Sequence, residues 1–200
     1  MGRPSHYFSR SPDVRSRPST VRLDLPDLSL TLRSDRGVFS GDRIDPGTRY
    51  LLTAAAPAPP SAGHLADIGC GYGPIALTLA TRSPAATVWA VDVNERALEL
   101  TRANAAAAGL ANVRVATPDA VPDDVRLAAL WSNPPVRVGK AALHDLLDRW
   151  LGRLDADGTA LLVVQKHLGS DSLHRWLDAT DWSVTRLGSR AGYRLLEVRR

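Results

Sequence analysis

A regular alternation of short apolar segments with longer amphipathic ones, from His64 to Ala179, constrains the fold more than any other feature of the chain. The short segments have the length of buried strands, and the longer ones carry apolar residues at helical spacing. Such alternation is typical of a parallel sheet with helices on both faces. The expected strands are 64–68, 87–91, 112–116, 127–131 and 160–164, and the expected helices are 74–82, 95–108, 140–151 and 170–179.

Both ends of the chain add strands to this pattern. Two C-terminal strands are expected over 182–187 and 193–198, and the short turn between them, 188–192, allows only antiparallel pairing. Near the N-terminus apolar residues alternate from Thr20 to Leu32 around a Pro-Asp turn, which predicts a β-hairpin. The sequence therefore predicts an α/β fold whose seven-stranded sheet is mostly parallel, with an antiparallel C-terminal strand and a small N-terminal hairpin.

The length of the chain favours one main domain. With 200 residues, 44% of them hydrophobic, it can bury one good core. We expect a flexible arm rich in Arg, Ser and Pro over 1–19, a β element and a helix over 20–56, and the main domain over 64–200. Asp45 precedes Pro46 at the start of the expected helix, which extends to about Ala56.

Charge and cysteine content exclude several classes of function. The net charge of +4 is compatible with a polyanionic partner, but it is weak evidence because nearly all the basic residues are Arg, which can reflect genome composition. Cys70 is the single cysteine, so an internal disulfide and a cysteine-based zinc site are excluded, no metal is expected, and the cytoplasm is the expected compartment. No run approaches the roughly 20 apolar residues that span a bilayer, and the first 20 residues lack the apolar core of a secretory signal.

A glycine-rich loop follows the first strand of the main domain. Gly69, Gly71 and Gly73 lie between Asp67 and Pro74, which would begin the next helix. Glycines let the backbone approach a ligand closely, and the amides of a helix start add positive potential. The spacing is G-x-G-x-G followed by proline, whereas a dinucleotide fingerprint is G-x-G-x-x-G. The loop therefore predicts a cofactor without a pyrophosphate and disfavours NAD.

Two acidic residues follow the next strands. Asp92 ends the second strand about 20 residues beyond the loop, where an acid can accept hydrogen bonds from ribose hydroxyls. Asn94 fits the helix N-cap at least as well, which leaves Asp92 for the ribose. Asp119 follows the third strand, where two interpretations stay open: an acceptor for an adenine amino group or a carboxylate in a surface turn.

The sequence Ser132-Asn133-Pro134-Pro135 follows the apolar run 127–131. An amide oxygen followed by a carbonyl held between two prolines forms a pair of fixed acceptors for the hydrogens of an –NH2 group. The motif predicts chemistry on a nitrogen, with Asn133, Pro134 and Pro135 as the catalytic residues.

Taken together, these motifs resemble those of class I S-adenosylmethionine-dependent methyltransferases, whose fold is Rossmann-like. The sequences 36–40, 133–140 and 165–166 are similar to the small-domain methyltransferases related to ribosomal RNA small subunit methyltransferase C. The chain resembles the short form of these enzymes, which is expected to lack the duplicated N-terminal half of the long form. The resemblance implies S-adenosylmethionine as cofactor and guanine N2 of 16S rRNA, in the small ribosomal subunit, as the methylated group. The implied cofactor-binding residues are Asp67, Gly69, Cys70, Gly71, Asp92, Val93, Asp119 and Asn133.

The acceptor side departs from the usual pattern. Many amine methyltransferases have an aromatic residue after the second proline, but position 136 is Val. The expected substrate-binding residues are Phe39, Val136, Arg137, Lys140 and Lys166. Two alternatives stay open: an N-methyltransferase that acts on a small molecule or a protein nitrogen, and an RNA-binding domain of the same fold without turnover.

Overall fold

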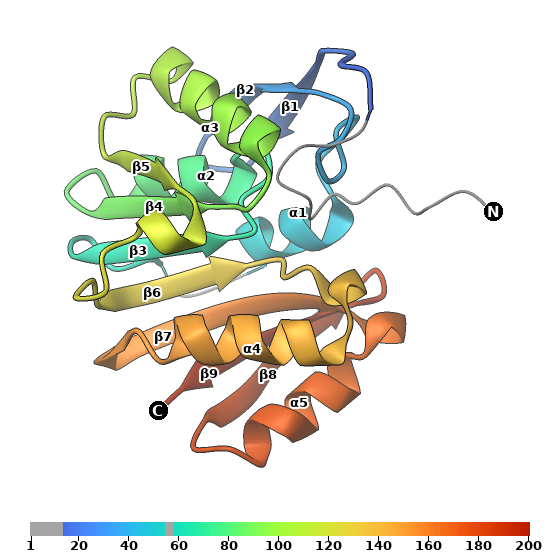
Figure 1. The fold of residues 1–200 in the computed structure, drawn as a ribbon, viewed down its shortest axis with the longest axis vertical. Coiled ribbons are helices and arrows are strands. Elements are labelled where there is room, and N and C mark those ends of the chain that lie inside the picture. The colour runs from blue at the N-terminus through green and yellow to red at the C-terminus, as the bar shows by residue number, and fades with distance from the viewer. Residues whose placement is uncertain (1–13, 55–57) are drawn as a thin grey trace.

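A computed structural model describes residues 14–54 and 58–200 (Figure 1). Its main sheet has seven strands in the order β5-β4-β3-β6-β7-β9-β8. The first five of these run parallel, and β9 pairs antiparallel with both β7 and β8, which confirms the predicted fold class. The strands are β3 (His64–Ile68), β4 (Thr87–Val91), β5 (Val113–Ala116), β6 (Leu127–Ser132), β7 (Leu154–Gln165), β8 (Ser183–Arg190) and β9 (Tyr193–Arg199).

The strand order places the functional motifs together. From β3 the chain adds β4 and β5 on one side, and it then crosses to add β6 and β7 on the other side. The reversal between β3 and β6 is the topological switch point, where ligands bind outside the carboxyl ends of the strands in open α/β sheets. The glycine loop, Asp92 and Asn133 all follow strands that end at this edge.

Helices cover both faces of the sheet (Figure 1). They are α1 (Pro46–Thr53), α2 (Pro74–Arg82), α3 (Glu95–Ala107), α4 (Lys140–Leu151) and α5 (Ser170–Asp178). Buried side chains of α1, α2 and α3 share one hydrophobic cluster with Leu65 and Val88, while those of α4 and α5 share a second cluster with Ala66 and Leu130. Since neighbouring strand residues enter opposite clusters, the sheet is buried on both faces.

The N-terminal hairpin packs on the first of these clusters. Strands β1 (Ser19–Asp24) and β2 (Ser29–Ser34) pair antiparallel, and Leu23 and Leu32 are buried beside the helices of that face. Asn104 of α3 joins the hairpin to the glycine loop: it accepts from Arg33 N at 2.7 Å and donates to the carbonyls of Arg33 and Tyr72 at 2.9 and 2.8 Å. The hairpin therefore shares its core with the main fold.

Several element boundaries differ from the prediction. Strand β7 begins at Leu154 rather than at Ala160. Residues 155–157, in its first part, are exposed and two of them are Asp, so they show no apolar alternation in the sequence. Strands β8 and β9 extend into the expected turn until only Ala191 and Gly192 separate them, both with positive φ as in tight hairpin turns. Helix α1 ends at Thr53, and residues 55 and 56 of its expected range lie outside the described residues.

The expected N-terminal arm falls only partly within the structure. Residues 1–13 lie outside the described residues. The following segment is bound to the body of the protein, since Ser16 Oγ and Arg17 N donate to the Asp35 carboxylate at 2.6 and 2.5 Å. The division into an arm, an N-terminal element and a main domain stays a prediction.

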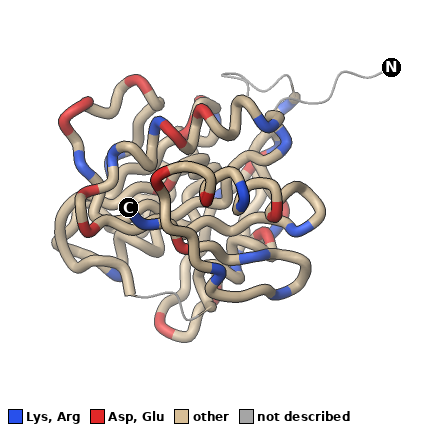
Figure 2. The backbone as a smooth tube through the Cα atoms, turned by 90° about the horizontal axis from the view of Figure 1, so that it is seen from below, with Lys and Arg blue, Asp and Glu red and all other residues tan. Residues whose placement is uncertain are grey.

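Basic and acidic positions are interspersed along the backbone in the view of Figure 2. Within 14–54 and 58–200, no helix has the length and apolar character needed to cross a membrane. The same residues contain no group of three or more His, Cys, Asp and Glu side chains that could hold a metal ion.

Candidate active site

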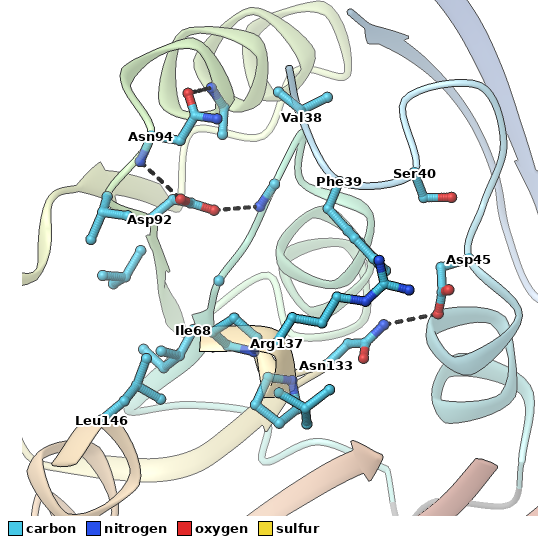
Figure 3. Close-up of a pocket in the computed structure, with 18 of the residues that line it drawn as sticks. Val38, Phe39, Ser40, Asp45, Ile68, Asp92, Asn94, Asn133, Arg137 and Leu146 are labelled. Atoms are coloured by element: carbon cyan, nitrogen blue, oxygen red, sulfur yellow. Dashed lines mark hydrogen bonds between the residues drawn. The ribbon is translucent and has the colours of Figure 1, made fainter. Parts of the chain in front are cut away.

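A cavity of about 370 Å³ opens at the carboxyl edge of the sheet (Figure 3). Its volume lies within the range of small-molecule sites, about 300–1,000 Å³. The residues of the three sequence motifs meet there: Ile68, Gly69 and Gly71 from the glycine loop, Asp92 and Val93 from the end of β4, and Asn133, Pro134 and Pro135 from the end of β6. Figure 3 shows Asp92 on one side of the cavity and Asn133 on the other.

The glycine loop is fixed against the end of β4. The amides of Gly69 and Cys70 both donate to the Val91 carbonyl, at 2.8 and 3.0 Å. Gly71 has a φ of +56°, and a Cβ added there would meet no atom within 4 Å. The loop therefore leaves open space beside its backbone where a ligand could approach.

Two of the predicted cofactor residues, Asp67 and Cys70, are buried at the glycine loop. Asp67 is fully buried, and its Oδ2 accepts from Ala76 N at 3.0 Å, while Oδ1 has no partner among the described residues. Burial raises the pKa of Asp67 well above its usual value. The side chain of Cys70 is buried near Thr101, which donates to the Gly71 carbonyl at 2.9 Å. Neither Asp67 nor Cys70 lines the cavity.

Asp92 faces the cavity while its carboxylate also holds the loop. Its Oδ2 accepts from Gly71 N and its Oδ1 from Asn94 N, each at 2.9 Å. Burial raises the pKa of Asp92, an effect opposed by the hydrogen bonds from Asn94, Gly71 and Val93. Because each carboxylate oxygen has a second lone pair, Asp92 keeps acceptor capacity toward the cavity. Asn94 caps α3, as predicted, by accepting from Arg96 N at 3.0 Å.

Asp119 does not line the cavity. Its side chain is 79% exposed and forms an ion pair with Arg149 of α4 at 2.9 Å. The neighbouring Pro118 lines the cavity instead, and Arg149 donates to its carbonyl at 2.8 Å. Of the two interpretations left open by the sequence, the geometry agrees with the carboxylate in a surface turn.

The end of β6 presents Asn133 in one fixed orientation. Its Nδ2 donates to Asp45 Oδ2 at 2.8 Å and to Thr48 Oγ1 at 3.1 Å, so both amide hydrogens are used (Figure 3). No described residue donates to Asn133 Oδ1, and this atom is not among the polar atoms sealed inside the protein. The side chain therefore offers an acceptor, and only an acceptor, to the cavity.

The Pro134 carbonyl is fixed by a tight turn. It accepts from Val136 N at 2.8 Å, and Pro135 between them has φ −75° and ψ 68°, the geometry of an inverse γ-turn. A carbonyl oxygen has two lone pairs, so one remains for another donor. Asn133 and Pro134, which both line the cavity, thus each carry an acceptor held in a fixed orientation.

Of the five residues expected to bind the acceptor, three line the cavity and two do not. Phe39, 46% exposed, lines the cavity together with Val136 and Arg137. Lys140 and Lys166 are exposed and do not line it. They lie in the first turn of α4 and just beyond β7, on the same edge of the sheet.

Several residues of this cavity were not predicted from the sequence, among them three that carry polar or charged groups. Arg43, Asp45 and Tyr193 all line it, although they come from a turn, a helix cap and the final strand. No described residue forms an ion pair or hydrogen bond with the guanidinium of Arg43. The pattern Asp45-Pro46-Gly47 marked only a helix start, and no local signal distinguished Arg43 or Tyr193.

Comparisons with known proteins identify the family. Residues 29–197 match the family model described as the methyltransferase small domain. The chain belongs to this family. Its members are class I methyltransferases that use S-adenosylmethionine, so the family predicted from the motifs and its cofactor are confirmed.

The relatives of this methyltransferase differ in length. It is 35% identical to the Bacillus subtilis protein YbxB, over 98% of each chain. It is 36% identical to ribosomal RNA small subunit methyltransferase C of Pseudomonas aeruginosa, over 79% of this chain and 51% of that protein. The chain therefore spans about half the length of the methyltransferase C relatives that it matches.

A similar solved structure confirms the fold. The T. thermophilus 16S rRNA N2 methyltransferase (RsmC), in complex with AdoMet and guanosine, superposes with a TM-score of 0.73 at 21% identity, over 94% of this chain and 52% of that one. The predicted Rossmann-like fold is therefore confirmed.

The residues of the cavity fit the cofactor of the family. A nucleoside needs an acceptor for its hydroxyls and apolar walls for its base, and a partly buried Asp92 lies beside Ile68, Val93, Pro118 and Leu146. The glycine loop adds open space along its backbone. Nothing in this lining conflicts with a ligand that lacks a pyrophosphate.

Proposed function

We propose that this methyltransferase transfers a methyl group to an exocyclic amine, and that the amine is guanine N2 in 16S rRNA. The observation that carries the proposal is the orientation of Asn133, whose amide hydrogens are bound to Asp45 and Thr48 while its oxygen is left for the cavity. A site of two fixed acceptors suits a group with two N–H donors. The name of the methyltransferase C relatives and the guanosine in the RsmC complex support the choice of base.

In this proposal the cofactor lies between the glycine loop and Asp92. Asp92 accepts hydrogen bonds from the ribose hydroxyls, the backbone of Gly69 and Gly71 leaves room for the ligand, and Asp67 and Cys70 act by supporting the loop. When bound, S-adenosylmethionine supplies an electrophilic methyl group on a sulfonium. Asp119 acts only through the position of Pro118, which lines the cavity.

Asn133 and Pro134 activate the acceptor. The lone pair of an exocyclic guanine nitrogen is delocalised into the ring, so the nitrogen is a poor nucleophile. Hydrogen bonds from its two N–H groups to Asn133 Oδ1 and to the Pro134 carbonyl weaken that conjugation and aim the lone pair at the methyl group. Fixed orientation of two reactants is worth about 7–11 kcal/mol in favourable cases. The same acceptors stabilise the positive charge that develops on nitrogen.

The acceptor base lies against Phe39. Phe39 is the large exposed aromatic side chain of the cavity lining. Val136, at the position where many amine methyltransferases have an aromatic residue, cannot stack on a base, whereas Phe39 can. The guanidinium groups of Arg43 and Arg137 lie at the same cavity and suit the phosphates that flank a nucleotide. Lys140 and Lys166 would contact RNA only beyond the cavity.

A methyl-transfer assay tests the proposed function. Purified protein is incubated with tritiated S-adenosylmethionine and, in parallel, 30S particles, naked 16S rRNA, total protein and free metabolites, and the labelled nucleosides are identified by mass spectrometry. We expect N2-methylguanosine from 16S rRNA or 30S particles, formed at least about 100-fold more slowly with Asn133→Ala. Label in protein or metabolites would favour the small-molecule or protein alternative. RNA binding without transfer under any condition would favour a non-catalytic RNA-binding domain.

A further inference from the structure

We propose that Asp45, anchored by Tyr193, is a positioning residue that sets the orientation of the Asn133 amide and thereby selects acceptors that donate two N–H groups. The inference rests on the proposed role of Asn133. It concerns two residues far from Asn133 in sequence, which the motifs did not indicate. Asp45 is 88 residues from Asn133, and Tyr193 is 148 residues from Asp45.

The Asp45 carboxylate contacts Asn133 and Tyr193 while it also caps α1. Asp45 is 8% exposed. Its Oδ2 accepts from Asn133 Nδ2 at 2.8 Å and from Thr48 N at 3.0 Å, and its Oδ1 accepts from the Tyr193 hydroxyl at 3.1 Å. A carboxylate accepts and cannot donate. The atom of Asn133 that faces Asp45 must therefore be nitrogen, and the oxygen is turned to the cavity.

Tyr193 reaches Asp45 because residue 47 is glycine. A Cβ at Gly47 would lie 2.4 Å from Cε1 and 2.5 Å from Cδ1 of Tyr193, closer than any real contact. Burial, together with the Asp45 carboxylate, raises the pKa of Tyr193 to about 12. The hydroxyl is thus a proton donor throughout the neutral range. This contact joins strand β9 to the start of α1, and Asp45 in turn contacts Asn133.

The consequence is selectivity at the acceptor. If the Asp45 contact were lost, the Asn133 amide could turn by half a rotation and present its NH2 group to the cavity. Two facing NH2 groups cannot hydrogen-bond with each other as donor and acceptor, so an amine would bind poorly. With Asp45 in place, the site accepts hydrogen bonds and disfavours substrates that present a carbonyl or a deprotonated oxygen.

The test compares two substitutions of the same residue. Asp45→Ser keeps a good N-cap for α1 but is too short to reach Asn133, whereas Asp45→Asn keeps both the cap and an acceptor oxygen. We expect Asp45→Ser to lower kcat about 10-fold or more, since small misplacements of reacting groups cost up to about 100-fold. Asp45→Asn should recover most of the rate, and Tyr193→Phe should lie between them. The Kd for S-adenosylhomocysteine should stay within about twofold in all three.

A readout independent of activity accompanies the kinetics. In ¹⁵N spectra, the side-chain amide hydrogens of Asn133, assigned with Asn133→Ala, should be protected from exchange in the parent protein and in Asp45→Asn, and exposed in Asp45→Ser. Full activity of Asp45→Ser beside an inactive Asn133→Ala would overturn the positioning role and leave the proposed function standing. Equal losses in Asp45→Ser and Asp45→Asn, with the amide still protected, would also overturn it. An Asn133→Ala protein as active as the parent would refute the proposed mechanism itself.

Discussion

The carboxylate of Asp92 accepts a hydrogen bond from the backbone N–H of Gly71 at 2.9 Å, so the acid at the end of β4 and the glycine loop after β3 form one unit. Asp92 thereby has two tasks, because it faces the cavity while it fixes the loop on the other side of the proposed cofactor site. Substitution of Asp92 should therefore affect both the cofactor site and the position of the glycine loop.

We expect Asp92→Ala to weaken cofactor binding by about 10- to 100-fold, because hydrogen bonds to a charged group contribute about 1.5–3 kcal/mol. Asp119→Ala is the matched control, since its exposed carboxylate pairs with Arg149 outside the cavity and should leave the affinity unchanged. Isothermal titration with S-adenosylhomocysteine measures both. A larger loss for Asp119→Ala than for Asp92→Ala would reverse the assignment of the two acids.

Asn104 should be important for stability rather than for chemistry. It is 2% exposed and satisfies three backbone groups of the hairpin and the glycine loop. Since each buried polar group left unpaired costs about 1–3 kcal/mol, Asn104→Ala should lower the free energy of unfolding by about 2–4 kcal/mol. The control Arg102→Ala, on the exposed side of α3, should change it by less than about 0.5 kcal/mol. Urea denaturation followed by circular dichroism measures the difference, and similar values for the two variants would contradict the role of Asn104.

Asp67 predicts a pH dependence with a defined sign. Burial raises its pKa well above the value of 3.8 that it has when exposed, so the folded protein binds this proton more tightly than the unfolded chain. The stabilising contribution is complete below pH 3.8 and is lost as the pH rises through the folded pKa. Relative to Asp67→Asn, the cofactor-free parent should therefore lose stability as the pH rises above 3.8, by at most about 1.4 kcal/mol per pH unit. Parallel stability curves for the two proteins, or a slope of the opposite sign, would disprove the burial effect.

Arg137 should contribute to RNA binding through phosphate. It is exposed and lines the cavity. We expect Arg137→Ala to weaken RNA binding and to lower the slope of log affinity against log salt by about one. Arg126→Ala, exposed at the opposite edge of the sheet beside the start of β6, is the control and should leave the slope unchanged. Equal effects of the two substitutions, measured by fluorescence anisotropy over a salt series, would argue against phosphate contact at the cavity.

The sequence predicted the elements of the fold because periodicity is a local property. Strands and helices of the main domain appear where the apolar spacing places them, and motifs at the carboxyl ends of parallel strands had to meet at one edge. The polar start of β7 was missed because Asp155 and Asp157 have weak strand propensity and this stretch is exposed, without the apolar alternation that indicates a strand.

The missed parts of the site depend on contacts between distant residues. Asp45 has the local pattern of a helix cap, and it is one, but its second role depends on Asn133 and Tyr193, which only the fold brings near. For Asp119, the local pattern indicated a role that the fold does not support. Its position after a strand suggested a ligand, yet Arg149 of α4 provides a partner outside the cavity. The cytoplasmic location and the choice of base stay predictions from the sequence and from the family resemblance.

The central claim is that Asn133 and the Pro134 carbonyl hold the acceptor amine, and single-turnover methyl transfer with Asn133→Ala at saturating cofactor tests it most directly. Loss of one preorganised hydrogen-bonding group in an active site typically costs about 100- to 1,000-fold in rate. We expect a loss of that size, and saturating cofactor ensures that it reflects methyl transfer rather than cofactor affinity. A variant that transfers methyl groups within about threefold of the parent rate would contradict the account.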